Sequence, residues 1–464
     1  MGLSLLAAED GITDNITMGM NYLKGPVFAL LLAALPLTAS AQQAPPPLPP
    51  MPTTGDMGTL PPPPQVPAPP QIIGGPVTGP AIPLEPPQPA QPLPGPQSPA
   101  QPSQPAPAAE PSQASTVPVS AIPPFAFSDR ADVEALIASA VYSCRETLDV
   151  AVYGFTLPRA AAAILDAHKR GVRVRVISNE THALGSKVSP ELRSLMAAGV
   201  EVRTLRGAGS YGIMHNKLGI YDGRMVSAGS FNWAVTADSS NHENIVFIRE
   251  ENTVDGYAKY FDWMWRFTRS PEDGPGPAYS QSHFGPPPED RSRPVYFNGA
   301  MLPGYSFSPA GRTEEDLVTA ARFARKSIKA AVFSFYSSTV GQALVEARRR
   351  GVDVEVVTDR VQASQSHMTG YLAENGVKFR WSRGQDGRGV MHHKYAVFDE
   401  KLLMTGSFNW SVNAQSNNFE NMYYTTAPEY VSAFSGHFDQ VFGSAVVPSA
   451  EDMQSLSSQS PQEE

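Results

Sequence analysis

The sequence predicts an α/β protein made of two copies of one lobe, and two observations support this prediction. Residues 214–233 (MHNKLGIYDGRMVSAGSFNW) and residues 391–410 (MHHKYAVFDEKLLMTGSFNW) are nearly the same segment, 177 positions apart. Around each copy, helical and strand patterns alternate in the same order, as in a sandwich whose helices cover a sheet. A purely structural repeat needs only matching apolar positions, so the repetition of polar residues indicates repeated chemistry.

The predicted elements follow the same order in both copies: helix, buried strand, glycine-ended helix, alternating strand, helix, strand, motif loop, two strands and a last helix. Glycine is the usual residue just beyond a helix C-terminus. In the first copy the clearest elements lie at about 130–145, 148–154, 160–171, 172–177, 218–222 and 225–228. In the second copy they lie at about 313–326, 328–334, 340–351 and 352–358.

The last helix of each copy carries aromatic residues at helical spacing, which we interpret as core packing rather than as a ligand surface. These residues are Tyr257, Phe261 and Trp265 in the first copy and Phe434, Phe438 and Phe442 in the second. We also assign Trp233 and Trp410, at the ends of the repeated segments, to the core.

The segments outside the two copies differ from them in composition. An apolar run follows Lys24 and precedes Ala39-Ser40-Ala41, which is typical of a secretory signal peptide, with translation beginning at Met18 or Met20. The run is shorter than the ~20 residues of a membrane span, and a retained anchor is the alternative. The predicted organisation is a signal peptide at 1–41, a Pro-rich linker at 42–124, lobes at 125–270 and 306–445, an interlobe linker at 271–305 and an acidic tail at 446–464.

Composition indicates a secreted or periplasmic protein without disulfides. Many of the 46 prolines fall in the linker before the first copy, where an extended, unfolded segment is expected. Such a linker suits contact with a partner or with the cell envelope. Cys144 is the only cysteine, which excludes an intramolecular disulfide and a cysteine metal cluster. The net charge of −9 lies outside the two copies, each of which is nearly balanced, so neither has the basic field of a non-specific nucleic-acid binder.

The polar residues of the two copies recur at identical spacing. Each copy has His-x-Lys-x4-Asp, then asparagine in Gly-Ser-Phe-Asn-Trp and glutamate in Asn-x-Glu-Asn. The first set is His215, Lys217, Asp222, Ser230, Asn232 and Glu243. The second set is His392, Lys394, Asp399, Ser407, Asn409 and Glu420.

These residue types suit a phosphodiester. Residues i and i+2 of a strand face the same side, so the histidine and lysine of each motif project together. Neutral imidazole attacks an electrophile or transfers a proton, lysine and asparagine stabilise phosphate oxygens, and glutamate orients the imidazole. The lysine disfavours a metal cation at the same place. Two facing sets put one histidine on each side of phosphorus, as in-line displacement requires.

The two motifs resemble the signature of the phospholipase D superfamily, His-x-Lys-x4-Asp followed by Gly-Ser-x-Asn, over about residues 125–445. The resemblance implies two pseudo-two-fold-related α/β/α sandwich lobes, each with a mixed sheet, and one active site that needs no metal or other cofactor. It also implies a covalent phosphohistidine intermediate.

Carried over by position, His215 is the nucleophile and His392 the general acid, which then acts as base toward water. Lys217, Lys394, Asn232 and Asn409 match phosphate-binding positions, and Glu243 and Glu420 match carboxylates that orient the histidines. Asp222 and Asp399 belong to the motif but have a more structural character. For Ser230 and Ser407 we expect supporting roles, and for His393 a structural one on the opposite side of the strand from His392.

The motifs do not select the substrate. The overall resemblance, export and nearly neutral lobes favour hydrolysis of phospholipids, with peripheral contact at a membrane surface. The short lobes, Gly-Ser-Phe-Asn-Trp and the Asn-x-Glu-Asn segment resemble the nuclease and cardiolipin-hydrolase branch, so a DNA or RNA endonuclease of the same superfamily is the alternative. Arg380, Arg383 and Arg388 are candidate contacts for a nucleic-acid backbone or a lipid headgroup. A non-catalytic binding module is a third alternative, although no motif histidine or lysine is lost.

Overall fold

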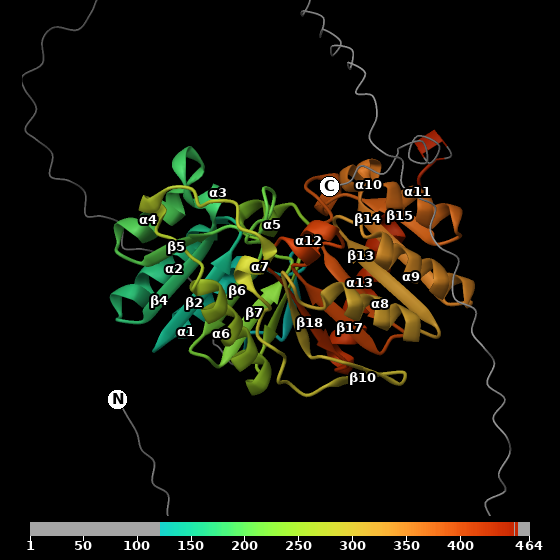
Figure 1. The fold of residues 1–464 in the computed structure, drawn as a ribbon, viewed down its shortest axis with the longest axis horizontal. Coiled ribbons are helices and arrows are strands. Elements are labelled where there is room, and N and C mark those ends of the chain that lie inside the picture. Colours follow the sequence, from blue (N-terminus) through green and yellow to red (C-terminus); the bar gives the residue numbers. More distant parts are fainter. Residues whose placement is uncertain (1–120, 450, 453–464) are drawn as a thin grey trace, which may run out of the picture. The chain divides into compact units, whose positions relative to one another are not determined.

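A computed structural model describes residues 121–449 and 451–452. The predicted signal peptide, nearly all of the Pro-rich linker and most of the acidic tail lie outside the described residues. The rest forms two lobes with one seven-stranded mixed sheet each, shown in Figure 1 in blue to green and in orange to red. The strand orders, β1-β9-β7-β6-β2-β4-β5 and β12-β18-β17-β16-β13-β14-β15, match strand for strand, which confirms the predicted duplicated α/β fold.

In the first lobe the chain alternates between strands and covering helices. The sheet strands are β1 (Phe125–Phe127), β2 (Thr147–Val152), β4 (Arg173–Asn179), β5 (Glu201–Leu205), β6 (Lys217–Tyr221), β7 (Met225–Gly229) and β9 (Asn244–Ile248). A short pair joins β3 (Phe155–Thr156) to β8 (Trp233–Ala234). The helices are α1 (Val133–Ser143), α2 (Pro158–Lys169), α3 (Glu180–Ala183), α4 (Pro190–Ala197), α5 (Val235–Ser239) and α6 (Glu251–Trp265).

The second lobe repeats this pattern. Its strands are β12 (Tyr305–Ser308), β13 (Ser327–Val332), β14 (Asp353–Asp359), β15 (Lys378–Ser382), β16 (Lys394–Phe398), β17 (Leu402–Gly406) and β18 (Glu420–Thr425). Its helices are α8 (Thr313–Phe323), α9 (Ser338–Arg349), α10 (Arg360–Gln365), α11 (His367–Glu374), α12 (Val412–Ser416) and α13 (Pro428–Ser444).

Local sequence explains where the helices begin and end. The carboxylate of Asp132 caps α1 by accepting the Ala135 N–H at 2.9 Å, and Ser189 caps α4 in the same way through Leu192. The helices α2 and α9 end before Gly171 (φ 86°) and Gly351 (φ 92°). These left-handed conformations agree with the predicted glycine-ended helices.

Each lobe has three layers, and the two lobes share one of their cores. Helices α1, α2 and α4 cover the outer face of the first sheet, and α8, α9 and α11 cover that of the second. The inner faces pack with α6 and α13 in a common core, which includes most of the predicted aromatic stripe. Trp233 and Trp410 are also buried, as expected, while Trp265 is only half-buried.

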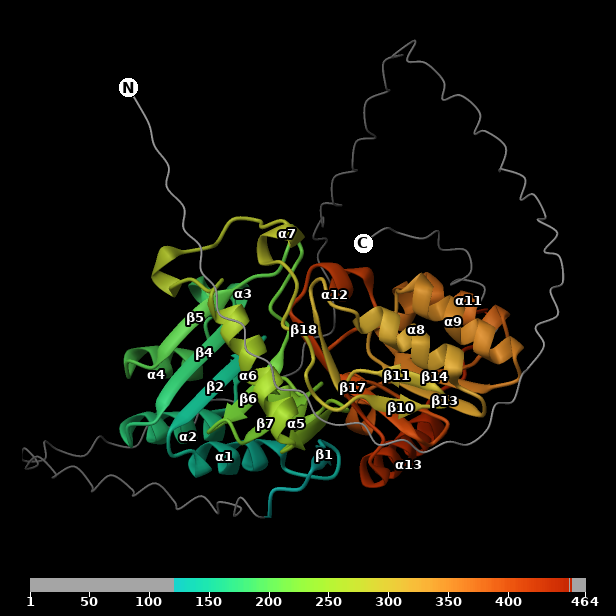
Figure 2. The same ribbon diagram turned by 60° about the horizontal axis from the view of Figure 1, so that its bottom comes forward.

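The lobes join along β7, β17 and β18, which lie side by side in Figures 1 and 2. The last helix of each lobe contacts the first strand of the other. Tyr260 of α6 donates its hydroxyl to the Ser308 carbonyl at the end of β12, and Phe434 of α13 packs on Phe127 of β1. The molecule therefore has a pseudo-two-fold junction.

The segment between the lobes is more ordered than a simple linker. It contains α7 (Gln281–Phe284) and a hairpin of β10 (Val295–Phe297) and β11 (Ala300–Leu302). Phe284 is buried in the shared core. At the C-terminal end, Val446 bonds the Trp381 backbone beside β15, so the fold extends into the predicted tail. Among the described residues, no helix combines the length and apolar character needed to cross a bilayer.

Candidate active site

The two motif histidines lie at the lobe junction, immediately before equivalent strands. His215 precedes β6 and His392 precedes β16, and each is only 6% exposed. The strands begin at Lys217 and Lys394, so the histidines lie in the preceding loops rather than on the strands as predicted. Lysine and histidine of each motif still lie together, because each lysine Nζ donates to the carbonyl of its histidine at 2.6 Å.

The histidines are paired with glutamates in a crossed arrangement. The Nδ1 atom of His215 lies 2.9 Å from both carboxylate oxygens of Glu420, which belongs to the second lobe. The Nδ1 atom of His392 lies 2.9 Å from Oε2 and 2.8 Å from Oε1 of Glu243, which belongs to the first lobe. Both glutamates are completely buried. Each imidazole is therefore oriented by the opposite lobe, which leaves its Nε2 for chemistry.

Backbone hydrogen bonds between the lobes fix this crossing. The His215 N–H donates to the Phe419 carbonyl at 3.0 Å, just before Glu420. The His392 N–H donates to the His242 carbonyl at 3.0 Å, just before Glu243. Each motif loop thus pairs with the segment of the other lobe that carries its glutamate, and the pairing sets the separation of imidazole and carboxylate.

Two buried lysines add positive charge. Lys217 is 1% exposed and Lys394 is fully buried. Their ammonium groups lie over the rings of Tyr153 and Phe333, at 5.7 and 4.8 Å from the centroids. Burial lowers the pKa of Lys217 to about 8 and that of Lys394 well below its usual range. An anionic ligand would offset this desolvation.

The electrostatics of the imidazoles show that both motifs share one environment. Burial lowers the pKa of His215 to about 4, with Glu420 opposing and both lysines assisting. The pKa of His392 lies well below its usual range. Burial is the largest cause, and the charges of Lys394, Lys217 and His215 lower the pKa further. Groups of both lobes thus act on each histidine, and the imidazoles are neutral near pH 7.

The two carboxylates differ in their hydrogen bonds. Glu420 accepts from the Ser407 hydroxyl at 2.6 Å and from the Asn418 amide at 3.1 Å. Burial acts to raise its pKa, but His215, Lys217 and Ser407 lower it on balance. Glu243 accepts a longer bond of 3.3 Å from Asn241, and burial raises its pKa to about 8. Glu420 is thus the better stabilised anion.

The motif asparagines and serines surround these pairs. Asn232 and Asn409 are half-buried, and the side-chain oxygen of each is buried without a hydrogen-bond partner among the described residues. Ser407 donates to Glu420 and accepts the Asn421 N–H at 3.1 Å, and Ser230 accepts the equivalent Asn244 N–H at 3.0 Å. Both serines therefore contact their loops and Ser407 also contacts a carboxylate, whereas the side-chain oxygens of the two asparagines make no hydrogen bond within the described residues.

The motif aspartates belong to the same sequence motif as the catalytic candidates, but they lie away from the paired histidines. Asp222 and Asp399 follow β6 and β16 at the ends away from the histidines. The Asp222 carboxylate accepts backbone N–H bonds of 2.8–3.1 Å from residues 145–147. Asp399 accepts equivalent bonds of 2.7–3.1 Å from residues 325–327. They hold the turn before the neighbouring strand, a structural role.

Two further sequence expectations concern residues beside the second motif. His393 is fully buried and turns away from His392, since its Nδ1 lies 2.9 Å from the Asn244 amide. Arg380 is not free for a ligand, because it donates to the Phe442 carbonyl at 2.7 Å and lies over that ring. Arg380 is therefore engaged with the end of α13, whichever phosphate-bearing ligand the site takes.

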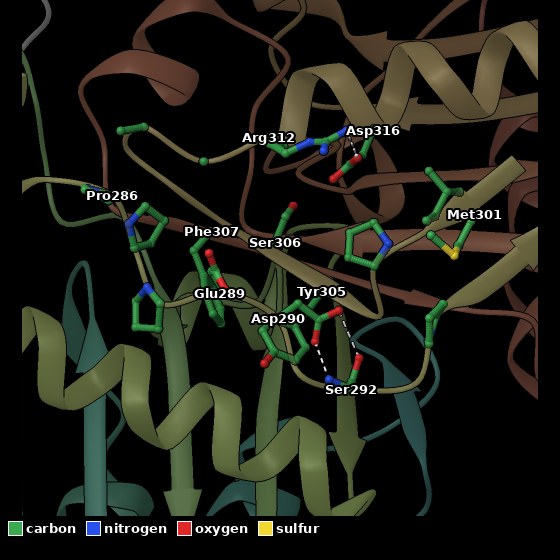
Figure 3. A pocket seen from close by; sticks show the side chains of 17 residues that line it. Pro286, Glu289, Asp290, Ser292, Met301, Tyr305, Ser306, Phe307, Arg312 and Asp316 are labelled. Atoms are coloured by element: carbon green, nitrogen blue, oxygen red, sulfur yellow. Dashed lines mark hydrogen bonds and ion pairs between the residues drawn. The ribbon is translucent and has the colours of Figure 1, made fainter.

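The molecule also has a hollow away from the histidines. A cavity of about 470 Å³ lies between the interlobe segment and the second lobe, lined within residues 286–316 by prolines and by Asp290, Tyr305, Arg312 and Asp316 (Figure 3). Its described lining contains no motif residue. We therefore do not assign the reaction to it.

Sequence reasoning missed the crossed pairing and the aromatic rings beside the lysines. Tyr153 and Phe333 follow β2 and β13, and their rings lie 5.3 and 4.6 Å from those of His215 and His392. The recurrence of an aromatic at the same place in LDVAVYGF (148–155) and IKAAVFSF (328–335) was the available signal. No feature of the sequence indicates whether each histidine contacts the glutamate of its own lobe or that of the other lobe, because the two motifs have identical spacing.

Comparison with known proteins places these features in a family. The family described as "Cardiolipin synthase, PLD-like domain" matches residues 136–265 and 317–442, one match in each lobe. The human "Mitochondrial cardiolipin hydrolase" is 39% identical over 127 residues, or 27% of the chain and 49% of the relative. The protein of the same name from Danio rerio is 30% identical over 184 residues, or 38% of the chain and 78% of the relative.

Bacterial proteins are similar as well. "Phospholipase D" from Rickettsia bellii is 34% identical over 134 residues, or 29% of the chain and 63% of the relative. The chain spans about half the length of most of the curated cardiolipin hydrolases that it matches. Among solved structures, phosphatidylserine synthase of Haemophilus influenzae aligns with a TM-score of 0.55 at 10% identity, covering 70% of the chain and 87% of that structure. This last likeness concerns the fold.

Proposed function

Since the chain belongs to the phospholipase D superfamily, we propose that it is a hydrolase of phospholipid phosphodiester bonds, acting through a phosphohistidine intermediate. The observation that carries this proposal is the pair of crossed histidine–glutamate contacts, His215 with Glu420 and His392 with Glu243. They support a single site at the lobe junction, where one imidazole from each lobe lies with the buried Lys217 and Lys394.

In the proposed reaction, Lys217, Lys394, Asn232 and Asn409 hold the non-bridging oxygens of the phosphodiester. The Nε2 atom of His215 attacks phosphorus, and the bond to the alcohol oxygen breaks. His392, which the negative charge of the bound phosphodiester keeps protonated, gives its proton to that oxygen. His392 then accepts a proton from water, whose oxygen attacks phosphorus and releases His215. The products are an alcohol and a phosphate monoester, and both histidines return to their initial state.

Hydrogen bonding supports His215 as the nucleophile. A nucleophilic imidazole must be neutral, with its Nδ1–H held by an acceptor. Glu420 is that acceptor, and its bonds from Ser407 and Asn418 stabilise the carboxylate anion. The neutral His215 beside an ionised Glu420 has a lone pair on Nε2 ready for attack. The position of His215 in the first motif supports the same assignment.

The comparisons support a lipid substrate. Relatives named cardiolipin hydrolase and phospholipase D match the chain, and neither lobe has an excess of basic residues. We further propose that the protein is exported, acting in the periplasm or outside the cell at a membrane surface, with the Pro-rich linker reaching a partner or the envelope.

The test offers the purified full chain a cardiolipin–phosphatidylcholine vesicle and a single-stranded oligonucleotide side by side. We expect phosphatidic-acid-type products from the vesicle, retained in EDTA. Replacing His215 with Asn should abolish turnover while leaving the melting temperature unchanged. Acid-quenched samples of the wild-type enzyme should carry a phosphoryl group on His215.

The matched control is His168→Gln, which changes a half-buried histidine of α2 far from the motifs and should leave turnover unchanged. Cleavage of the oligonucleotide alone would replace the lipid proposal with an endonuclease. Binding without any product would indicate a non-catalytic module. Activity of the His215→Asn variant equal to that of the wild type would remove His215 from the mechanism.

A further inference from the structure

A second group of ionisable side chains lies at the lobe junction, apart from the catalytic pairs. Asp129 follows β1, His242 lies in the loop before β9, and His437 lies on α13 of the other lobe. One ligand atom of each, a carboxylate oxygen or an imidazole nitrogen, lies within 4.8 Å of those of the other two. Three segments distant in sequence thus place three metal-ligating groups together.

The separations suit a metal ion. Nε2 of His437 lies 3.0 Å from Oδ1 of Asp129. A tetrahedral Zn²⁺ with bonds of about 2.0–2.2 Å needs ligand atoms roughly 3.3 Å apart. A ligand atom of His242 lies within 4.8 Å of both, so a side-chain rotation that brings it nearer completes the group. The exposure falls from Asp129 through His242 to the buried His437, so an ion has an entry path from solvent.

The other half of the molecule shows that packing alone does not require these histidines. His437 stacks on Phe127 with ring centroids 3.9 Å apart and an interplanar angle of 3°. At the equivalent place on α6, Tyr260 stacks on Phe307 at 3.8 Å and 2°. The same stacking is therefore made by a tyrosine in one copy and by a histidine in the other, and only the histidine adds a metal-ligating nitrogen.

The counterparts of Asp129 and His242 in the other copy also lack metal-ligating side chains. By the 177-residue offset, His242 corresponds to Phe419, which packs in the shared core. Pairing of β1 with β9 and of β12 with β18 makes Asp129 the counterpart of Pro309. Non-ligating residues occupy both sister positions. The three ligating types thus occur together in one half, at a place where the fold is satisfied without them.

A fourth imidazole borders this group. The fully buried His393 has its ring 5.0 Å from that of His437, and its Nε2 has no hydrogen-bond partner among the described residues. The sister position is Asn216, whose amide donates to the Tyr260 hydroxyl and to the Phe419 carbonyl. The asparagine is fully engaged, whereas the histidine retains an uncommitted nitrogen beside the cluster.

We propose that Asp129, His242 and His437 bind one divalent transition-metal cation of the Zn²⁺ class. Two imidazoles and one carboxylate form a donor set that this class of cation prefers, and three protein ligands leave one position for water. The ion joins the turn after β1 to α13, and so joins one lobe to the other. It lies behind the second motif, since the His242 carbonyl accepts from the His392 N–H. Its role is to hold the lobe junction rather than to take part in the reaction.

The experiment titrates the tag-free, metal-stripped full chain with Zn²⁺ and measures the bound equivalents, the affinity and the melting temperature. All nine histidines lie within the described residues, so no masked segment adds a histidine ligand. We expect one tightly bound equivalent and a rise in melting temperature. The variants Asp129→Asn and His242→Gln should each weaken Zn²⁺ binding at least about tenfold.

Two controls locate the ion. His168→Gln, outside the cluster, and His215→Asn, at the catalytic site, should both retain the bound equivalent and the thermal shift. Because Asp129 is exposed, its substitution tests the site with little risk to folding. Absence of a bound equivalent in the wild type, equal affinity in all variants, or loss of binding only in His215→Asn would each overturn the proposal. None of these readouts depends on the substrate or on turnover.

Discussion

At the residue scale, each carboxylate of the motifs has a task set by its neighbours. Glu243 and Glu420 are buried against the imidazole of the opposite lobe. Asp222 and Asp399 instead collect backbone N–H groups at the far ends of their strands. The sequence marks all four as repeated acids, and only their surroundings separate orientation of a histidine from the capping of a turn.

Replacing Glu420 with Gln should lower kcat by about 10²–10⁴-fold with little change in KM, because His215 loses the carboxylate that fixes its tautomer. Steady-state kinetics on vesicles measure this split. The control is Glu429→Gln, an exposed acid of α13 that should leave kcat unchanged. A wild-type kcat in Glu420→Gln would contradict the role of the crossed pair.

Replacing Asp399 with Ala should destabilise the protein by about 2–3 kcal/mol, since three backbone N–H groups and the Asn298 amide lose a charged acceptor. Burial acts to raise the pKa of Asp399, but these bonds lower it on balance. The melting temperature should fall while kcat stays close to wild type. An unchanged melting temperature with lost activity would instead return Asp399 to the active site. Asp166→Ala, in an exposed ion pair, should cost about 0.5 kcal/mol or less.

At the element scale, the Gly-Ser-Phe-Asn segment requires its glycine because the neighbouring strand approaches too closely for a side chain. A Cβ on Gly406 at the end of β17 would lie 2.1 Å from the Asn421 carbonyl oxygen of β18. The equivalent Gly229 of β7 has φ 142° and a Cβ there would lie 2.4 Å from the Asn244 carbonyl oxygen. This close approach sets Ser407 beside β18, which begins at Glu420, and Ser230 beside β9, which Glu243 immediately precedes.

Gly406→Ala should therefore force β17 and β18 apart and lower both the melting temperature and kcat. The matched control is Gly436→Ala in α13, where a Cβ meets nothing within 4 Å. That change should be neutral or stabilise the helix by up to about 1 kcal/mol. Thermal melting and kinetics of the two variants together test the prediction, which equal behaviour of both would refute.

The predicted elements agree with the structure where the pattern is periodic and long. The helix expected at about 130–145 is α1 (Val133–Ser143), and the strand expected at 172–177 overlaps β4 (Arg173–Asn179). The segment at 271–305 was expected as a linker, yet it forms α7 and a hairpin. Its order depends on burying Phe284 in the core shared by both lobes, a long-range contact that local patterns do not report.

At the scale of the whole molecule, the junction determines the charge of the site. Groups from both lobes act on Lys217, whose pKa burial lowers to about 8, with Glu420 and Glu243 opposing that shift. Burial lowers the pKa of His215 to about 4. The site therefore combines a neutral imidazole with a protonated ammonium only between these values.

This predicts a bell-shaped dependence of kcat/KM on pH. Activity should be lost as the pH falls through about 4, because protonated His215 has no lone pair for attack. It should also be lost as the pH rises through about 8, because uncharged Lys217 no longer stabilises phosphate. A soluble short-chain phosphodiester serves as substrate, so that vesicle charge does not contribute. Undiminished kcat/KM at pH 10 would contradict the role of Lys217.

The sequence by itself determined the duplicated α/β fold and the chemical types of the site, because periodicity and repeated polar residues are local properties. His215, Lys217, Asn232 and their counterparts were identified in this way. Only the tertiary structure decided that Glu420 serves His215 and that Asp399 serves a turn, because both depend on contacts between segments far apart in the chain. The cluster of Asp129, His242 and His437 likewise depends on such contacts, since no sequence pattern predicts that α13 lies beside the end of β1.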